Sequence, residues 1–195
     1  MPQSFMPELE ALHSDVVNAL HRFARADKSA RAERFESLPG RAWFLKLHEG
    51  LKGTPPLDAV VLAGLDFELP ADYRHFLLDI ASGGLASDFG LLPFTLQNAE
   101  ELVHNFERFE EYRVADFEDA SDDEYWLPQF HGARGVLLGQ EAYNGHEVFM
   151  VCEGHLPGSV WLFDQNSHVF APLARSFEEH VSKNLENLQG MLTGF

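Results

Sequence analysis

Short apolar runs alternate with turn signals through most of the second half of the chain. The runs lie at residues 136–139, 146–151, 159–164 and 168–171, and the turns between them include Asn144-Gly145, Leu156-Pro157-Gly158 and Gln165-Asn166-Ser167. Asn-Gly is a strong hairpin signal, and apolar runs of this length are typical of strands. We therefore expect an antiparallel meander here.

Helical patterns lie on both sides of the expected meander. Five apolar residues recur at three- and four-residue steps and predict one long helix over residues 7–35: Leu9, Leu12, Val16, Leu20 and Phe23. Residues 57–65 predict a short apolar helix. Residues 69–80 predict a second helix with clearer end signals: Pro70 and Asp72 in its first turn, and Gly83-Gly84 after its end.

The remaining elements complete the expected fold. Residues 90–95 predict a strand whose proline favours a sheet edge, and Asn98 predicts the cap of a helix that runs from Ala99 through Phe106, with Tyr112 as its furthest end. Ser176 and Glu179 are spaced as in a capping box and open a last helix, whose expected buried face is Phe177, Val181, Leu185 and Leu188. The fold class is thus α+β: an antiparallel meander sheet flanked by helices, with an N-terminal helical extension.

A linker signal divides the chain near residue 53. Gly53-Thr54-Pro55-Pro56 combines turn-forming residues, and the charge balance changes there too. We expect a helical extension at residues 1–52 and the α+β domain at residues 53–195. The sequence leaves open whether the extension is a separate domain or a helical flap packed on the rest.

Charge restricts the partners of this chain. Its 14 Lys and Arg against 31 Asp and Glu give a net charge of −17, and residues 1–52 hold eight of the basic and seven of the acidic residues. The remaining six basic and 24 acidic residues make residues 53–195 strongly negative. Such a surface repels nucleic acid and anionic membranes and attracts basic proteins. Acidity that serves only solubility is the alternative.

Residue usage indicates a soluble cytoplasmic protein. The longest apolar run, residues 59–63, is far shorter than the ~20 residues of a membrane span. The first residues lack the features of a signal peptide, and the single Cys152 cannot form an internal disulfide, which favours a reducing compartment.

The sequence motifs do not predict an enzyme. The chain has no Gly-x-Ser-x-Gly elbow, no phosphate-binding glycine loop and no His-Glu-x-x-His helix, and its ten histidines are scattered. Cys152 follows an apolar run and is expected to be a buried thiol, and Asp164 to be a turn residue. We therefore expect no catalytic residues, no metal site and no cofactor.

Residues 100–124 hold eleven acids and two bases, interleaved with aromatic residues. Aromatic side chains among charges are typical of binding hot spots, although a solvated acidic loop with aromatic core anchors has the same composition. The predicted partner-binding residues are Glu110, Glu111, Asp116, Glu118, Asp119, Asp122, Asp123, Glu124, Tyr125 and Trp126.

Three motifs resemble the SUKH superfamily over about residues 57–188. They are the Leu69-Pro70-x-x-Tyr73-x-x-Phe76-Leu77 helix before Gly83-Gly84, the strand 158–164 that ends in an Asp, and the closing segment 173–181 with its Ala-x-Ser-Phe start. Residues 1–52 lie outside the resemblance, and His180-Val181 replaces the aromatic-leucine ending typical of that family.

This superfamily includes a fungal cell-wall-assembly regulator and many bacterial immunity proteins against polymorphic toxins. The resemblance implies a non-enzymatic scaffold that binds and blocks a cognate toxin, and the charge favours a basic one such as a nuclease. The alternatives are a housekeeping regulatory scaffold of the cell-wall-regulator type and an uncharacterised hydrolase or ligand-binding protein.

Overall fold

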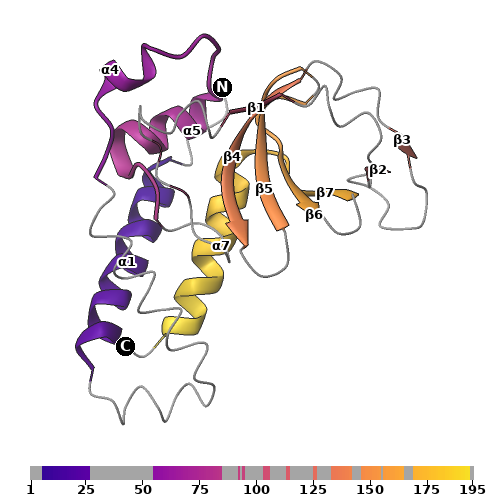
Figure 1. Ribbon diagram of the computed structural model, residues 1–195. Helices are drawn as coiled ribbons and strands as arrows, with labels where there is room; N and C mark the ends of the chain where they lie inside the picture. Colours follow the sequence, from indigo (N-terminus) through magenta and orange to yellow (C-terminus); the bar gives the residue numbers. More distant parts are fainter. Residues whose placement is uncertain are drawn as a thin grey trace.

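A computed structural model describes residues 6–26, 55–84, 92, 94, 103–105, 113–114, 125–126, 133–141, 146–154, 156–164 and 169–193. Within them, seven strands form one sheet in the order β1-β4-β5-β6-β7-β2-β3. Its centre is the antiparallel meander of β4 (Arg134–Glu141), β5 (His146–Glu153), β6 (Val160–Asp164) and β7 (Val169–Ala174), as predicted. The α+β fold with a sheet flanked by helices is confirmed (Figure 1).

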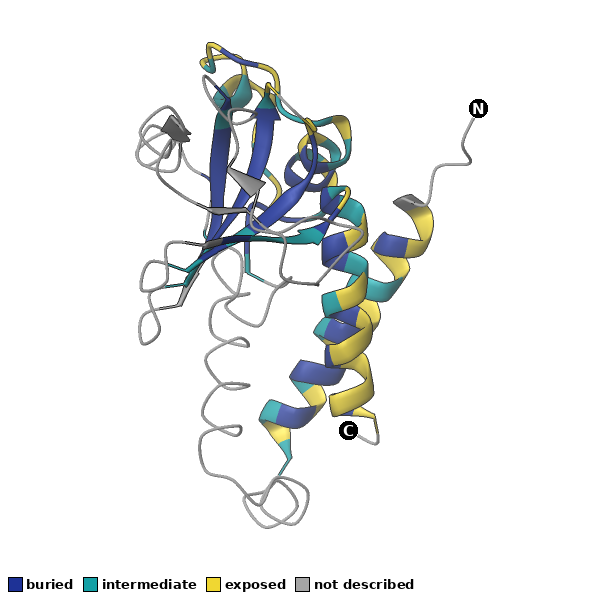
Figure 2. Cartoon of the chain, turned by 90° about the vertical axis from the view of Figure 1, so that its right-hand side faces the viewer, coloured by how far each residue is buried: buried dark blue, intermediate teal, exposed yellow. Residues whose placement is uncertain are grey.

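Both faces of the central strands are covered. Five consecutive residues of β5, Val148 to Cys152, are buried although their side chains alternate between the two faces. On one face, the rings of Phe163 and Phe170 stack with their centroids 4.7 Å apart, and Phe149 lies within 6.5 Å of both. Figure 2 shows the buried residues continuing from the strands into the inner stripes of the two long helices.

The two long helices pack against each other at one side of the sheet. Helix α7 (Phe177–Leu192) lies between α1 (Met6–Arg25) and the sheet (Figures 1 and 2). The predicted faces are buried, apart from Leu12 of α1, which is half-buried against the core: Leu9, Val16, Leu20 and Phe23 on α1, and Phe177, Val181, Leu185 and Leu188 on α7. All of them belong to one hydrophobic core with the strands.

The boundary near residue 53 and the predicted helical residues 27–35 lie outside the described residues. The division at residue 53 therefore stays a prediction.

The N-terminus of α7 is capped by two separate elements. The backbone N–H of Glu179 donates to Ser176 Oγ at 3.1 Å, as the capping-box pattern predicts. The N–H of Glu178 donates to Asp72 Oδ2 at 3.0 Å, so a residue 106 positions earlier in the sequence supplies the second acceptor. Asp72 stands in the first turn of its own helix but acts on the positive end of another.

The segment between residues 55 and 81 is helical in two short pieces. Helix α4 (Ala59–Leu62) is shorter than the predicted helix at 57–65. Helix α5 (Ala71–His75) begins after Pro70, which is its N-cap, and continues as a π-helical turn, η1 (Phe76–Ile80). The wider turn closes with the N–H of Ala81 donating to Phe76 O at 2.9 Å, and it buries Phe76 and Leu77.

The predicted helix over residues 99–112 is wrong at Val103–Asn105, which form strand β1 and pair antiparallel with β4. The open edge of β4 offers hydrogen bonds to the backbone of this segment, which overrides the local helical pattern. The other residues of that range, 99–102 and 106–112, lie outside the described residues.

Two further short strands were not predicted. Strand β2 (Arg113–Val114) pairs parallel with β7, and β3 (Tyr125–Trp126) pairs antiparallel with β2. In the predicted strand at 90–95, Leu92 and Phe94 are described and neither lies in a strand, although the N–H of Leu92 donates to Leu138 O at 2.8 Å.

Candidate protein-binding surface

The structure describes two of the ten predicted partner-binding residues. Tyr125 and Trp126 form β3, whose backbone pairs with β2 at one edge of the sheet. The other eight lie outside the described residues: Glu110, Glu111, Asp116, Glu118, Asp119, Asp122, Asp123 and Glu124. A binding role for this acidic segment stays a prediction.

A second surface lies near the other edge of the sheet, where β1 pairs with β4 (Figure 1). Its centre is α4, whose four residues are all apolar and of which none is buried. Val60 is 72% exposed. The helix is held in place at its start, where the N–H of Val60 donates to Asp58 Oδ1 at 3.0 Å. Ala59 and Val60 are exposed and Val61 and Leu62 are half-buried, so α4 presents part of its apolar surface to solvent.

A hollow of about 460 Å³ opens beside α4. Its walls come from α4, the turn after it and the first turns of α5, with Glu68 and Arg74 among the polar lining residues. Seven apolar residues of the described part of the chain line it: Ala59, Leu62, Ala63, Leu65, Phe67, Leu69 and Ala71. Leu62, Leu65 and Leu69 pack against the hydrophobic core with their other side, which makes the wall firm.

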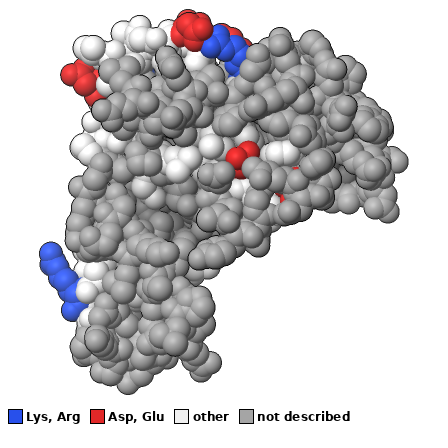
Figure 3. All heavy atoms as spheres, viewed as in Figure 1, with Lys and Arg blue, Asp and Glu red and all other residues white. Residues whose placement is uncertain are grey.

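Exposed carboxylates border this apolar surface. Asp58 precedes α4, and Asp66 and Glu68 lie in the turn between α4 and α5. Figure 3 shows acidic side chains on both sides of an uncharged stretch at the upper end of the molecule, where Figure 1 places α4. The surface therefore combines an apolar centre with a mainly negative border.

Arg134, the first residue of β4, fixes the turn that carries these carboxylates. Its guanidinium donates to Asp66 Oδ1 at 2.6 Å, lies 3.6 Å from Glu153 Oε2, and stacks over the ring of Phe67 at 4.5 Å from the centroid. The hydrogen bond from Arg134 lowers the pKa of Asp66, so this carboxylate is ionised at neutral pH. Glu153 faces the same guanidinium, and Arg134 therefore adds little positive charge to the surface.

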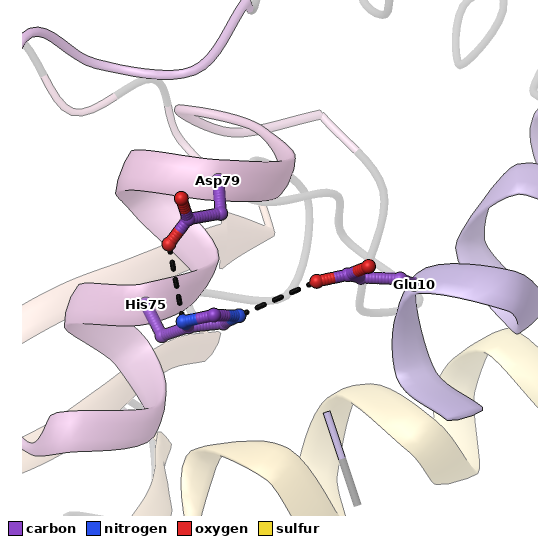
Figure 4. A network of polar contacts seen from close by, with 3 residues as sticks. All are labelled: Glu10, His75 and Asp79. Atoms are coloured by element: carbon purple, nitrogen blue, oxygen red, sulfur yellow. Dashed lines mark hydrogen bonds and ion pairs between the residues drawn. The ribbon is translucent and has the colours of Figure 1, made fainter. Parts of the chain in front are cut away.

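A clasp of polar contacts joins α1 to α5 and η1, with Glu10 on α1, His75 at the end of α5 and Asp79 on η1. His75 Nε2 lies 3.4 Å from Glu10 Oε1, and His75 Nδ1 lies 3.1 Å from Asp79 Oδ2 (Figure 4). Both ring nitrogens face a carboxylate, which leaves neither free to act on a substrate. The arrangement joins two helices rather than forming a reaction site.

Buried titratable groups elsewhere belong to the core. Burial raises the pKa of the Cys152 thiol to about 12, so the thiol is protonated and unreactive at neutral pH, in agreement with the expected buried thiol. Burial also raises the pKa of Tyr73. In the residues that the structure describes, no group of three or more His, Cys, Asp or Glu side chains is arranged to hold a metal ion.

The exposure of α4 is the feature that sequence reasoning missed, because an apolar run predicts a helix but not what covers it. Among the described helices, none is long and apolar enough to cross a membrane. No family model, curated protein or solved structure matches this chain.

Proposed function

We propose that this chain is a non-enzymatic protein-binding domain that binds and neutralises a cognate toxin, in the manner of the SUKH-type immunity proteins that its motifs resemble. The observation that carries the proposal is the exposed apolar helix α4, bordered by carboxylates, on a chain of net charge −17.

The physical basis is complementarity. An apolar patch beside a firm hollow gives affinity, because burying it removes apolar area from water. Negative charge gives speed and selectivity, since it attracts a positively charged partner and repels nucleic acid. A nuclease that must hold phosphates presents such a positive surface, and carboxylates placed over it would occupy the substrate's position.

The test uses the protein encoded by the gene adjacent to that of this chain. The two proteins are co-expressed, purified by a tag on one of them, and the toxicity of the neighbour is measured with and without this chain. We expect a stable complex and protection of the host cell. A neighbour that is not toxic, or that does not bind even at low salt, would contradict the proposal and favour the housekeeping scaffold.

A further inference from the structure

We propose that the hollow beside α4 receives one apolar side chain of the basic partner, with partner Lys or Arg residues on either side of it pairing with Asp58 and Glu68. This inference rests on the proposed function and names the contact that performs it. It assigns binding to the α4 edge of the sheet rather than to the acidic segment at the β3 edge.

Apolar residues of α4 and of the turn that follows it are exposed to solvent. Helix α4 keeps Val60 72% exposed, and the neighbouring Ala59 and Ala63 are exposed as well. Apolar area left in water is unfavourable at ~25 cal/mol per Å², so an ordered apolar helix at the surface gains from being covered. The adjoining hollow is lined by Glu68 and Arg74 as well as by apolar residues, so a complementary occupant has an apolar body with charged groups beside it.

The hollow is large enough and its wall firm enough to hold one side chain of a partner. Its volume of about 460 Å³ lies within the ~300–1,000 Å³ typical of pockets that enclose a small ligand, which is ample for one large side chain. Phe67 is buried, and the ring is held from above by the Arg134 guanidinium at 4.5 Å. A wall fixed in this way needs little rearrangement on binding, which favours affinity.

The charge around the hollow favours a basic partner over a second copy of this chain. The described border carries Asp58, Asp66 and Glu68 against Arg74, with the charges of Arg134 and Glu153 opposing one another. A second copy of this chain would bring another net charge of −17 against this border, and the repulsion disfavours that occupant. A partner with cations beside its apolar side chain is complementary.

The experiment follows peptide binding to the full-length, isotope-labelled chain by NMR. The probe is a capped peptide of the sequence Lys-Lys-Trp-Lys-Lys, with a second peptide carrying Ala for Trp and a third carrying Glu for every Lys. We expect amide shifts to change at Leu62, Ala63 and Phe67, and each altered peptide to bind about tenfold more weakly, as for loss of a hot-spot contact.

Two variants of this chain locate the contact. Ala63→Phe fills the hollow while keeping the surface apolar, and we expect it to weaken the peptide about tenfold or more. Ala11→Phe places the same side chain on the exposed face of α1 and should bind as the wild type does. Glu68→Gln is a second variant, which removes a carboxylate that lines the hollow, and it should weaken binding even where Ala63→Phe does not fold.

Four results of the peptide experiment would overturn the inference: no binding at millimolar peptide, unchanged binding by Ala63→Phe and Glu68→Gln, shifts confined to Tyr125 and Trp126, or concentration-dependent shifts at α4 without peptide. The last would make a second copy the occupant. An adjacent-gene protein that binds Ala63→Phe as tightly as the wild type overturns the inference and leaves the proposed function intact. An adjacent-gene protein that does not bind at all contradicts the function and leaves the peptide result standing.

Discussion

Two neighbouring titratable residues in the first turn of α7 respond to their surroundings in opposite ways. His180 is buried, and this burial, helped by the nearby positive charge of Lys183, lowers its pKa to about 4. Glu178 is partly buried and faces Asp72 and Glu8, and burial followed by these like charges raises its pKa. Both shifts disfavour the charged form in the folded chain.

The His180 shift predicts acid sensitivity. The ordinary pKa of His, 6.5, applies to the unfolded chain, so protons bind the unfolded chain first as the pH falls. Stability from neutral His180 is thus present above pH 6.5 and is lost as the pH falls toward about 4. The loss is roughly 3 kcal/mol by the standard conversion of pKa to free energy. Denaturant unfolding across this range should give a shallower pH dependence for His180→Gln than for the wild type; parallel curves would contradict the assignment.

The Glu178 shift predicts a stabilising substitution. The folded pKa lies above the ordinary 4.5, so the ionised carboxylate destabilises the fold at neutral pH, and this cost is lost as the pH falls through the folded pKa to 4.5. We expect Glu178→Gln to raise the melting temperature at pH 7 and to make no difference near pH 3. A lower melting temperature at pH 7 would show that the favourable interaction of Glu178 with the α7 dipole outweighs its repulsion by Asp72 and Glu8.

At the scale of elements, helix α7 joins the layers of the molecule. Its first residue, Phe177, packs against the rings of Tyr73 at 4.6 Å and Phe76 at 5.3 Å between centroids. Its later turns pack against α1. The motif residues Tyr73, Phe76, Leu77, Trp161 and Phe177 are all buried, so their place in the core is confirmed.

Truncating one of these buried aromatic residues should destabilise the whole fold. We expect Phe177→Ala and Trp161→Ala each to lower the free energy of unfolding by ~3–5 kcal/mol, because each leaves a cavity among buried side chains. Trp161→Ala also removes the hydrogen bond that the indole N–H donates to Ser159 Oγ at 2.8 Å in the wild type. Thermal unfolding measures the effect, and the exposed Met191→Ala on α7 serves as a near-neutral control. A variant that keeps the wild-type stability but no longer binds the partner would show that the substituted residue acts in binding rather than in the core.

At the scale of the whole molecule, the N-terminal helix belongs to the common core. Leu9, Val16, Leu20 and Phe23 are each at most 3% exposed, and the clasp of Glu10, His75 and Asp79 holds the same helix at its surface. Burial of such side chains contributes about 1.5 kcal/mol or more for each.

Limited proteolysis tests this arrangement. We expect cleavage near residues 53–56, where Pro55 and Pro56 are exposed, and we expect the piece containing α1 to remain bound to residues 57–195 in size-exclusion chromatography. A chain expressed without residues 1–26 should unfold at a markedly lower temperature. Equal stability with and without these residues would make the extension an independent unit.

The negative charge of the whole molecule should speed association with a basic partner, and neutralising the acidic segment at residues 110–123 tests this. Neutralising Glu110, Glu111, Asp116, Glu118, Asp119, Asp122 and Asp123 together should slow association with the adjacent-gene protein and leave stability equal or higher. The effect should shrink with salt, since the Debye length falls from ~10 Å at 0.1 M to ~3 Å at 1 M. The double variant Asp58→Asn with Glu68→Gln neutralises carboxylates beside α4 in the same way, and it should also slow association with the adjacent-gene protein. An unchanged rate at low salt in the seven-residue variant would show that this segment serves solubility alone.

The sequence alone determined those elements whose signals are local. The turn residues and apolar runs predicted the meander of β4 to β7, the Ser176 and Glu179 spacing predicted the start of α7, and the three- and four-residue steps predicted the buried stripe of α1. These patterns work because a strand or helix with one apolar face shows its period directly in the chain.

Only the tertiary structure decided the pairings between distant residues and the exposure of apolar ones. Val103–Asn105 became a strand because β4 offered an open edge, and Asp72 caps a helix that lies 106 residues further on. Helix α4 has an apolar sequence that suits a core, yet none of its four residues is buried. Local pattern states which surface is apolar; what covers that surface depends on contacts between residues far apart in the chain.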